Sequence, residues 1–503
     1  MAGTWDEEHD VVVVGSGAAA MSGAWQAART GLSTVVLEKT PLLGGTSAYS
    51  GAACWLPGTD VQRRAGTGDS TESARTYLRC LLGDRDKVKQ EAFLETAPAL
   101  VDELEQDPAL EFTWRAFPDY FDRPGRVPQG RSFVPVDLPV AELGNLAALV
   151  RPIADRDRLG LGHGRGDLTA GRALIGRLLL ALDRTGHATV RTGHDVDELV
   201  TDDTGRVVGV VASTGSGPVR VGARHGVLLA AGGFERSDAL RAEHAVPGSA
   251  AWSMAPAGSN TGDVALAAVA LGAATDLMDQ GWWAPGVATP DGGASFAVGF
   301  RGGLVVDQAG RRFANESLPY DQFGRLMAAD PARVPSYAVF DERTAGQFPA
   351  FVIPGLPTED HLAAGTWVRA GSLDELATAI GVPADALVES VSRFNDFAAA
   401  GRDDEFQRGR DEFDRHFADP VLVPVDRPPY VAARLVLADL GTKGGLVTDV
   451  DSRVLREDGS AIEGLYAAGN TSASWTGPFY PGPGIPIGSG MVFASRAVTH
   501  LAR

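Results

Sequence analysis

The chain has 503 residues, 44% of them apolar and 22% charged, a composition typical of a globular protein large enough to form two or more lobes. Its net charge is −19 and no cluster of lysine and arginine offers a basic face, which argues against nucleic acid as a partner. Cys54 and Cys80 have no metal-ligand or C-x-x-C spacing, which indicates a reducing compartment. The N-terminus lacks a signal-peptide pattern and no apolar run reaches the roughly 18 residues of a membrane span, so we expect a cytoplasmic protein.

The first forty residues predict a strand, a helix and a second strand. The β-branched run 10–14 is typical of a buried parallel strand, and a helix of small residues follows it to about Thr30. Residues 34–37 predict the second strand, which ends in the acidic residue Glu38. This order is typical of a dinucleotide-binding βαβ unit.

The turn between the first strand and the helix carries the G-x-G-x-x-G/A pattern of such units. Gly15 permits the tight turn, Gly17 lets the backbone approach a pyrophosphate, and Ala20 lets the helix pack closely on the strand. The helix N-terminus offers free N–H groups and a positive dipole end to the phosphates. Glu38 is placed to accept hydrogen bonds from ribose hydroxyls and to repel a 2′-phosphate.

Three later segments add to this pattern. Residues 44–51 form a loop rich in glycine and hydroxyl side chains, and residues 227–234 and 464–470 each predict a strand followed by a glycine turn. The three segments resemble those of the fumarate-reductase and succinate-dehydrogenase flavoprotein superfamily, in the same order along the chain. The resemblance implies FAD as the cofactor; NAD is the weaker alternative.

Between these segments the sequence predicts several further elements. Residues 151–166 predict a loop, and residues 173–182 predict a mostly buried helix in which Arg177 is the polar exception. Residues 189–221 alternate as β-strands do, and residues 373–398 predict helices that cap an inserted lobe. We therefore expect an α/β fold, with a Rossmann-like FAD-binding domain and an inserted α+β substrate (catalytic) domain. The expected bounds are 1–280 and 435–503 for the discontinuous FAD-binding domain, and 281–434 for the substrate domain.

Three of the eight tyrosines lie in loops of unusual composition. They are Tyr120 in P-D-Y, Tyr320 in N-E-S-L-P-Y-D and Tyr480 in F-Y-P-G-P-G. A single loop tyrosine is usually a packing residue with its hydroxyl in water. Together the three loops resemble those of the 3-ketosteroid Δ1-dehydrogenase family, and the resemblance runs from about residue 8 to the C-terminus. Other segments that share it are 130–132, 260–263, 279–283 and 440–445.

The resemblance implies an FAD-dependent oxidoreductase that acts on CH–CH donors and desaturates the A ring of a 3-ketosteroid between C1 and C2. Tyr320 would be the base that takes a proton from C2, and Tyr120 would support that base. Tyr480 and the backbone N–H of Gly484 would bind the C3 carbonyl oxygen, while a hydride leaves C1 for N5 of the flavin. The roles are chemically consistent, because a free phenol with a pKa near ~10 is a poor base at neutral pH and needs such help. Each donor aimed at a developing enolate oxygen is typically worth roughly 3 kcal/mol.

The cofactor site that we expect combines the nucleotide-binding turn with the later segments. Its residues are Gly15, Gly17, Ala18, Ala19, Glu38, Lys39, Gly45, Thr46, Ser47, Ser50, Gly51, Val196, Ala231, Gly232, Asn260, Asp263, Gly469, Asn470, Ile485, Pro486 and Ile487. We expect no metal site, because the histidines are scattered and no metal-binding motif occurs.

Alternatives remain for the substrate and the partners. The same chemistry on a smaller cyclic ketone, such as an oxocyclohexane carboxylate, would need a cation for the carboxylate, and Arg301 is a candidate; the sequence does not place Arg301, Trp282 or Trp283 relative to a pocket. A fumarate-reductase-like activity is disfavoured, because Asn470 is not followed by the expected H-G-x-N-R type segment. A flavin-binding protein without catalysis would leave the tyrosine loops unexplained. An external electron acceptor, a quinone or a redox protein, is expected, with at most a loose membrane association.

Overall fold

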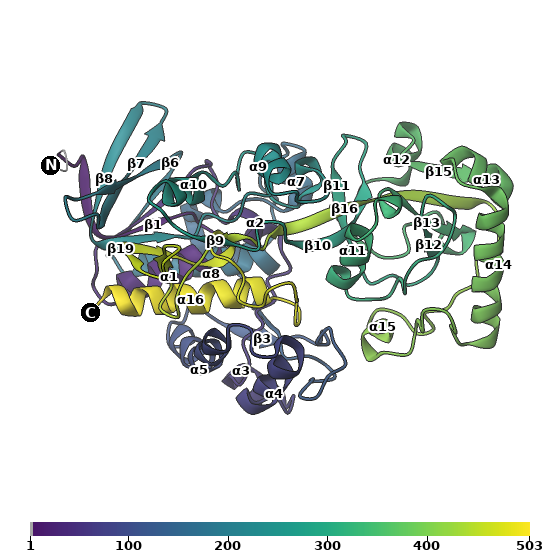
Figure 1. Cartoon of the computed structure of the whole chain (residues 1–503), viewed down its shortest axis with the longest axis horizontal. Coiled ribbons are helices and arrows are strands. Elements are labelled where there is room, and N and C mark those ends of the chain that lie inside the picture. Colours follow the sequence, from purple (N-terminus) through teal and green to yellow (C-terminus); the bar gives the residue numbers. More distant parts are fainter. Residues whose placement is uncertain (1–3) are drawn as a thin grey trace. The chain divides into compact units, whose positions relative to one another are not determined.

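The structure is a computed structural model that describes residues 4–503 (Figure 1). Residues 1–3, which belong to the expected FAD-binding domain, lie outside the described residues. The chain forms two compact units. The first unit comprises the residues up to His244 together with 255–281 and 441–503, and the second comprises 245–254 and 282–440. Among the described residues, no helix combines the length and the apolar composition that a membrane crossing requires.

The first unit combines a large sheet with helices on its faces. Its elements are β1 (Glu7–Val14), α1 (Ala18–Arg29), β2 (Thr34–Glu38), α2 (Gly45–Tyr49), α3 (Asp60–Ala65), α4 (Thr71–Leu82), α5 (Lys87–Leu104), β3 (Phe112–Trp114), β4 (Phe133–Pro135), α6 (Val140–Leu143), η1 (Gly144–Leu149), α7 (Ala154–Arg158), α8 (Ala170–Arg184), β5 (Ala188–Thr192), β6 (Asp195–Thr201), β7 (Val207–Thr214), β8 (Gly217–Leu229), α9 (Asp238–Glu243), α10 (Asp263–Ala270), β9 (Thr275–Asp276), β17 (Gly445–Leu446), β18 (Arg453–Leu455), β19 (Ala461–Ala467), η5 (Gly469–Thr471) and α16 (Ile485–Leu501).

The main sheet of the first unit has the strand order β18-β19-β8-β1-β2-β5, and β6 and β7 continue it from β8. The strands β19, β8, β1, β2 and β5 run parallel, as a doubly wound nucleotide-binding fold requires. Every residue of β2 is buried, and Val11, Val12 and Val13 of β1 have no exposed surface. The β-branched runs of the sequence therefore form the buried parallel strands that they predict.

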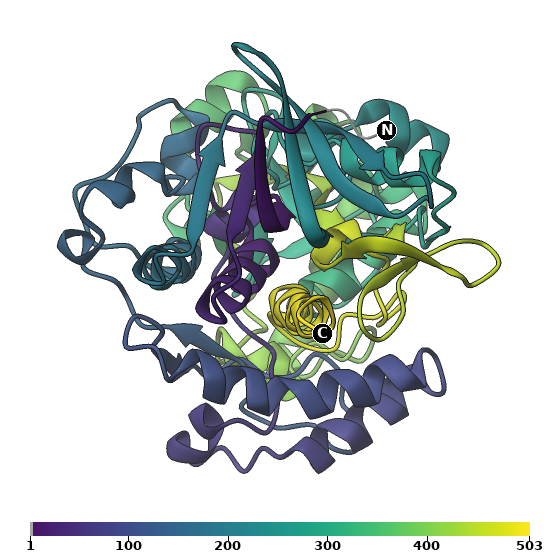
Figure 2. The ribbon, with the colours of Figure 1, turned by 90° about the vertical axis from the view of Figure 1, so that its left-hand side faces the viewer.

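Two helices from opposite ends of the chain, α1 and α16, pack side by side against this sheet. Figure 2 shows α16 end-on with α1 beside it. Gly23 makes the close packing possible, since a Cβ atom there would lie 2.8 Å from Leu228 of β8 and 3.3 Å from Ala494 of α16. Small residues in α1 thus bring the helix near enough to the strand to fix the turn before it.

The second unit is built on a sheet of its own. Its elements are η2 (Ala250–Trp252), β10 (Gly281–Ala288), β11 (Ala294–Val298), β12 (Leu304–Val306), α11 (Tyr320–Ala328), η3 (Pro331–Arg333), β13 (Ser336–Asp341), η4 (Glu342–Thr344), β14 (Phe351–Ile353), α12 (Thr358–Ala364), β15 (Trp367–Ala370), α13 (Leu373–Ile380), α14 (Ala384–Ala400), α15 (Glu412–His416) and β16 (Tyr430–Thr442). The strand order is β12-β13-β16-β10-β11-β14, with β15 also paired to β16. A cluster of buried hydrophobic residues joins β12 and β13 to α13 and α14; Figure 1 labels these four elements.

The structure corrects one detail of the sequence interpretation and explains another. Residues 151–166 are not entirely a loop, because α7 forms within them around alternating charged residues. Arg177, the polar exception in helix α8, is buried, and its guanidinium donates to the carbonyl groups of Val136, Ala109 and Asp137 at 2.6–3.0 Å. A buried arginine is stable there because backbone carbonyls replace the water that it loses.

Candidate active site

The turn after β1 has no room for a side chain at Gly15. The residue has φ +101°, and a Cβ atom would lie 2.4 Å from the carbonyl oxygen of Ala230 and 2.7 Å from Cα of Ala231. Its N–H donates to the Leu37 carbonyl at 2.8 Å, which ties the turn to the end of β2. At Gly15 the turn is therefore bare backbone at the ends of the neighbouring strands. A bound pyrophosphate requires such a turn, because no side chain then keeps it from the backbone.

The loop that precedes α2 and α2 itself lie against the N-terminus of α1. Ser47 Oγ accepts a hydrogen bond from the Ala18 N–H at 3.1 Å, and a Cβ atom on Gly17 would lie 3.3 Å from the same oxygen. Gly17 is the N-cap of α1 and provides no side chain to the helix end. The first two segments expected to bind the cofactor are therefore brought together.

The C-terminal segments reach the same end of α1. A Cβ atom on Gly490 of α16 would lie 3.0 Å from Cβ of Ala19 and 3.3 Å from Cα of Gly469. Residues 485–487, the first turn of α16, follow the N-cap Gly484. Segments from the two ends of the sequence thus converge on one helix terminus.

Glu38 organises the turn that follows β2. Its side chain is buried; one carboxylate oxygen accepts a hydrogen bond from Ser16 Oγ at 2.5 Å, and the other accepts from the N–H and hydroxyl of Thr40, both at 2.8 Å. The Ser16 hydroxyl in turn accepts from the Gly44 N–H at 2.9 Å. Each carboxylate oxygen has two lone pairs and retains some capacity for a further donor, so ribose binding by Glu38 stays a prediction.

Lys39 forms a charged cluster with residues from two distant segments. Its ammonium group lies 2.7 Å from the Asp263 carboxylate, 3.0 Å from that of Asp195 and 3.1 Å from the Thr261 hydroxyl. Burial lowers the pKa of Lys39, but the two carboxylates more than compensate and raise it above its usual value. Lys39 and Asp263, both expected at the cofactor, are therefore direct partners, and Val196 follows Asp195 in β6.

Asn260 and Asn470 gather around a buried carboxylate, that of Glu235. Asn260 donates to Glu235 at 2.6 Å, and a Cβ atom on Gly232 would lie 2.2 Å from the Asn260 amide nitrogen. A Cβ atom on Gly441 would lie 2.4 Å from the amide nitrogen of Asn470 and 3.4 Å from Glu235. Glu235 was missed by the sequence analysis, because an acidic residue one position after a glycine turn has no motif of its own.

Tyr120 and Tyr480 meet in the first unit. Their rings are 5.2 Å apart between centroids at an angle of 61°, and both residues are buried. The Tyr120 N–H donates to the Pro481 carbonyl at 3.0 Å, so the two loops are joined beside the rings. Gly484 has φ +93°, and a Cβ atom there would lie 2.0 Å from the Ala53 carbonyl oxygen. Only glycine fits at the residue whose N–H is expected to bind the substrate carbonyl.

Tyr320, the expected base, lies in the second unit and is the first residue of α11. It is 7% exposed, and its ring packs edge-on against Phe296 of β11, with a centroid distance of 4.9 Å and an interplanar angle of 85°. The preceding residue, Pro319, is the N-cap of the helix and fixes where α11 begins. The hydroxyl-bearing ring is therefore held by a helix start on one side and an aromatic ring on the other.

A buried cluster of charges holds the segment just before Tyr320. Arg312 donates to both carboxylate oxygens of Glu316 at 2.9 Å and to Asp403 at 2.9 Å. Arg408 donates to Glu316 at 3.1 Å and to the Ser317 hydroxyl at 3.0 Å. The side chains of Glu316 and Arg408 have no exposed surface. Buried charges of this kind are stable only when they are fully paired, so the cluster fixes the geometry of the turn.

Replacing Glu316 by glutamine is expected to destabilise the protein by about 3–5 kcal/mol, because two arginines then lose their common carboxylate. Burial raises the pKa of Glu316, but Arg312 and Arg408 more than offset this and hold the pKa below its usual range. The contribution is therefore complete above the unfolded pKa of about 4.3 and is lost as the pH falls through the lower folded value. Urea unfolding of both proteins at neutral and acidic pH measures it.

The matched control is Glu389→Gln, because Glu389 is exposed and lies 3.9 Å from exposed Arg311. Exposed pairs contribute little to stability, so this variant should unfold as the wild type does. An equal loss of unfolding free energy in both variants would show that the buried cluster contributes no more to stability than an exposed ion pair.

Comparisons with known proteins identify the family. The model of the FAD binding domain family matches residues 10–487. The 3-oxosteroid 1-dehydrogenase of Rhodococcus opacus is 42% identical, with 99% of each chain covered. The chain belongs to the FAD-dependent 3-ketosteroid Δ1-dehydrogenase family.

Two further proteins are similar to this chain over nearly its whole length. The solved 3-ketosteroid Δ1-dehydrogenase of Sterolibacterium denitrificans, in complex with 1,4-androstadiene-3,17-dione, is 34% identical, with a TM-score of 0.90 and 99% of both chains covered. The 4-oxocyclohexanecarboxylate 2-dehydrogenase of Sinomonas cyclohexanicum is 35% identical, with 97% of this chain and 92% of that protein covered. The predicted FAD cofactor, fold class and oxidoreductase class are confirmed: the protein is an FAD-dependent oxidoreductase that acts on CH–CH bonds.

The geometry of the first unit fits FAD. The turn at Gly15 has the bare backbone that a pyrophosphate needs, and the start of α1, whose N-cap Gly17 has no side chain, adds the N–H groups of a helix N-terminus. Sequence analysis missed Ser16, whose hydroxyl joins Glu38 to the next glycine loop. Ser16 occupies the position between the motif glycines Gly15 and Gly17, where the motif accepts any residue, so the motif does not point to it.

Proposed function

We propose that this member of the Δ1-dehydrogenase family removes two hydrogens from ring A of a 3-ketosteroid, a proton from C2 and a hydride from C1. The observation that carries the proposal is the meeting of the buried rings of Tyr120 and Tyr480, where the loop that carries Tyr480 ends at the positive-φ glycine Gly484. A phenol hydroxyl and a backbone N–H in one short loop are the two donors that bind a carbonyl oxygen.

Each residue has one task in this proposal. The Tyr480 hydroxyl and the Gly484 N–H hold the C3 carbonyl oxygen and stabilise the negative charge that develops on it. The Gly484 N–H is available because the first N–H groups of a helix have no partner within it. Tyr320 takes the proton from C2, and Tyr120 supports the charge on that base. FAD, when bound, accepts the hydride at its N5 atom.

We assign the first unit as the FAD-binding domain and the second as the substrate domain. The glycine turn at Gly15, the acid Glu38 and the first turn of α16 all belong to the first unit and support its assignment. The cofactor residues proposed from the sequence fall in the same unit. Residues 45–51 would line the ribityl chain, and Gly469 and Asn470 would close the site. Tyr320 belongs to the second unit, which supports the assignment of that unit as the catalytic insertion.

The second candidate function is the same desaturation on a smaller ketone that carries a carboxylate. The Sinomonas relative favours it, because that enzyme is a 4-oxocyclohexanecarboxylate 2-dehydrogenase. Arg301, the candidate partner for the carboxylate, is exposed, and its guanidinium carbon lies 4.2 Å from the centroid of the Phe351 ring. A guanidinium already stacked on an aromatic ring has a partner, which favours the steroid.

Anaerobic mixing of the purified holoenzyme with androst-4-ene-3,17-dione tests the proposal. We expect the visible flavin band to bleach, with formation of a 1,4-dien-3-one that has lost two hydrogens. An unchanged spectrum with this steroid, together with bleaching by 4-oxocyclohexanecarboxylate, would move the substrate to the small cyclic ketones. No bleaching with either compound would contradict the tyrosine chemistry itself.

We further propose that an external acceptor, either a quinone or another redox protein, reoxidises the flavin, and that the enzyme works in the cytoplasm with at most a loose membrane association. Support for a reducing compartment comes from the thiols: Cys54 is buried, Cys80 is exposed, and neither forms a disulfide.

A further inference from the structure

The hydroxyl of Tyr77 joins the two loops that carry Tyr120 and Tyr480. Tyr77 lies in α4 and has no exposed surface. Its hydroxyl donates to the Pro481 carbonyl at 2.6 Å and accepts a hydrogen bond from the Phe121 N–H at 3.1 Å. It therefore contacts the residue after Tyr120 and the residue after Tyr480. The Tyr120 N–H donates to the same Pro481 carbonyl at 3.0 Å. The Pro481 carbonyl therefore accepts hydrogen bonds from both Tyr77 and Tyr120.

The loop from residue 478 to residue 484 depends on its carbonyl groups for support. It contains three prolines, which have no N–H to donate. Besides Tyr77, the Ser132 hydroxyl donates to the Pro483 carbonyl at 2.5 Å, and the Lys443 ammonium donates to the Pro478 carbonyl at 2.8 Å. The position of the Tyr480 hydroxyl therefore follows from a few side-chain donors outside the loop.

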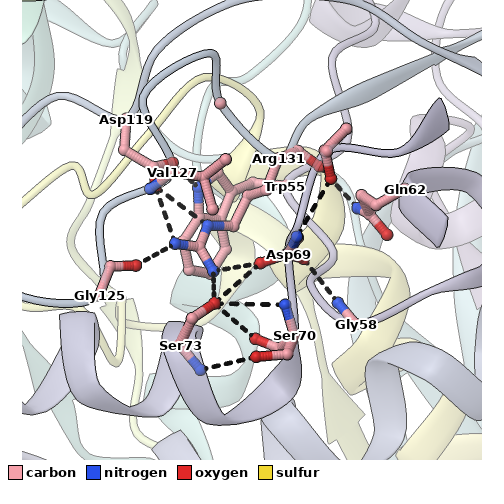
Figure 3. A network of polar contacts seen from close by, with 12 residues as sticks. Trp55, Gly58, Gln62, Asp69, Ser70, Ser73, Asp119, Gly125, Val127 and Arg131 are labelled. Atoms are coloured by element: carbon pink, nitrogen blue, oxygen red, sulfur yellow. Dashed lines mark hydrogen bonds and ion pairs between the residues drawn. The ribbon is translucent and has the colours of Figure 1, made fainter.

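A buried cluster of charges lies beside the Tyr77 ring, and Figure 3 shows the contacts of its arginine, Arg131. Arg131 donates through two nitrogens to one oxygen of Asp119, at 2.9 and 3.0 Å, and to Asp69 at 2.7 Å. Its guanidinium carbon lies 5.6 Å from the centroid of the Tyr77 ring. The other oxygen of Asp119 accepts the indole N–H of Trp55 at 2.8 Å. Asp119 immediately precedes the catalytic candidate in the Tyr120 loop, so this cluster fixes the backbone at that point.

Pairing with two carboxylates keeps the guanidinium of Arg131 charged. The side chains of Arg131, Asp119 and Asp69 have no exposed surface. Burial lowers the pKa of Arg131, but the two carboxylates more than compensate and raise it, so the guanidinium stays charged. Burial also raises the pKa of Tyr77 well above its usual value. The Tyr77 hydroxyl therefore keeps its proton and acts as a donor to Pro481.

We propose that Tyr77 is a positioning residue for the desaturation: its hydroxyl fixes the Tyr480 loop, with its carbonyl-binding groups, relative to Tyr120. The inference rests on the proposed function, because it takes Tyr480 as a ligand of the substrate carbonyl. It requires no contact between Tyr77 and the substrate. The Tyr77 hydroxyl donates its hydrogen to the Pro481 carbonyl, and its oxygen accepts the hydrogen bond from the Phe121 N–H.

Tyr77→Phe tests the inference, because it removes the hydroxyl and keeps the ring beside Arg131. We expect kcat/KM, measured per bound flavin with androst-4-ene-3,17-dione, to fall about 10- to 100-fold, since displacements of about 1 Å in a site cost up to about 10²-fold. The same substitution in a Tyr480→Phe background should cost far less, because the hydroxyl that Tyr77 positions is then absent. A structural role alone would give the same factor in both backgrounds.

Two further variants complete the design. Ser132→Ala removes the other hydroxyl that holds the loop and should lower kcat/KM in the same direction, so the inference is tested even where Tyr77→Phe folds poorly. Ser452→Ala is the matched control: Ser452 is buried, and its hydroxyl donates to the Phe493 carbonyl at 2.7 Å, outside the proposed site. This control should keep the wild-type kcat/KM.

The outcomes separate the two proposals. A wild-type enzyme that bleaches with the steroid, together with a Tyr77→Phe variant of unchanged kcat/KM or of equal loss in both backgrounds, overturns the positioning role and leaves the proposed function intact. If the wild type bleaches only with 4-oxocyclohexanecarboxylate, the same cycle is measured with that ketone. A wild type inactive on both overturns the proposed function, and the role of Tyr77 falls with it.

Discussion

Replacing Tyr320 by phenylalanine should lower turnover by roughly 10²–10⁴-fold, as removal of a general base does, while FAD remains bound. The substitution removes one hydroxyl and keeps the ring that packs edge-on against Phe296, so the fold around α11 should persist. Tyr320 is the first residue of that helix, where the positive end of the helix dipole favours a negative charge.

Stopped-flow measurement of flavin reduction under anaerobic conditions gives the rate directly. The control is Tyr337→Phe, because Tyr337 is a half-buried tyrosine of β13 in the same unit with no proposed role. Near-normal reduction in Tyr320→Phe would assign the base to another residue. A large loss in Tyr337→Phe would indicate a general effect of removing a hydroxyl from this unit.

Gly15→Ala should give a protein that is purified without its yellow colour. The new Cβ atom would lie 2.4 Å from the Ala230 carbonyl oxygen and 2.7 Å from Cα of Ala231, and both neighbours are backbone atoms that cannot rotate away. Overpacking of this kind costs about 1–3 kcal/mol, and strain at φ +101° adds to it. If the turn relieves the clash by moving, FAD affinity should fall about tenfold or more. The ratio of flavin to protein absorbance and a titration with FAD measure the effect.

Gly31→Ala is the matched control for this variant. Gly31 has φ +89°, but no atom lies within 4 Å of the position of its Cβ. The control therefore carries the conformational strain without the clash and should keep its FAD. Equal loss of FAD in both variants would attribute the effect to backbone strain and not to the close approach at the turn.

The elements that the sequence predicted well are those set by local pattern. The run of valines in β1, the small residues of α1 and the strand before Glu38 form as expected, because burial, helix propensity and turn chemistry agree within a short segment. The alternating stretch 189–221 likewise forms strands, and the helices expected over 373–398 are α13 and α14. Of the site residues, the structure brings Tyr120, Tyr480 and Gly484 together.

The sequence did not predict the partners of residues that meet across long separations. Tyr77 occupies an ordinary amphipathic helix, and its hydroxyl bonds to residues 44 and 404 positions away. Both contacts are to backbone groups, which have the same chemistry at every position. The side chains of the two partners take no part, so their identity in the sequence does not reveal the contacts. Arg177 was recognised as polar, but only the fold reveals the three carbonyl groups that accept its hydrogen bonds.

The packing of α16 against α1 has a consequence for the order of folding. A hydrogen bond of 2.9 Å between Gln26 of α1 and Ser495 of α16 spans 469 residues, and β19, which follows the second unit in the sequence, pairs with β8, which precedes it. Closing so long a loop is slow, and the small residues of α1 face solvent until α16 arrives. The nucleotide-binding sheet is therefore incomplete until β19 and α16 have been made, because both contribute to the packing around α1 and β8. A chain shortened before α16 should depend on chaperones and should accumulate as aggregates.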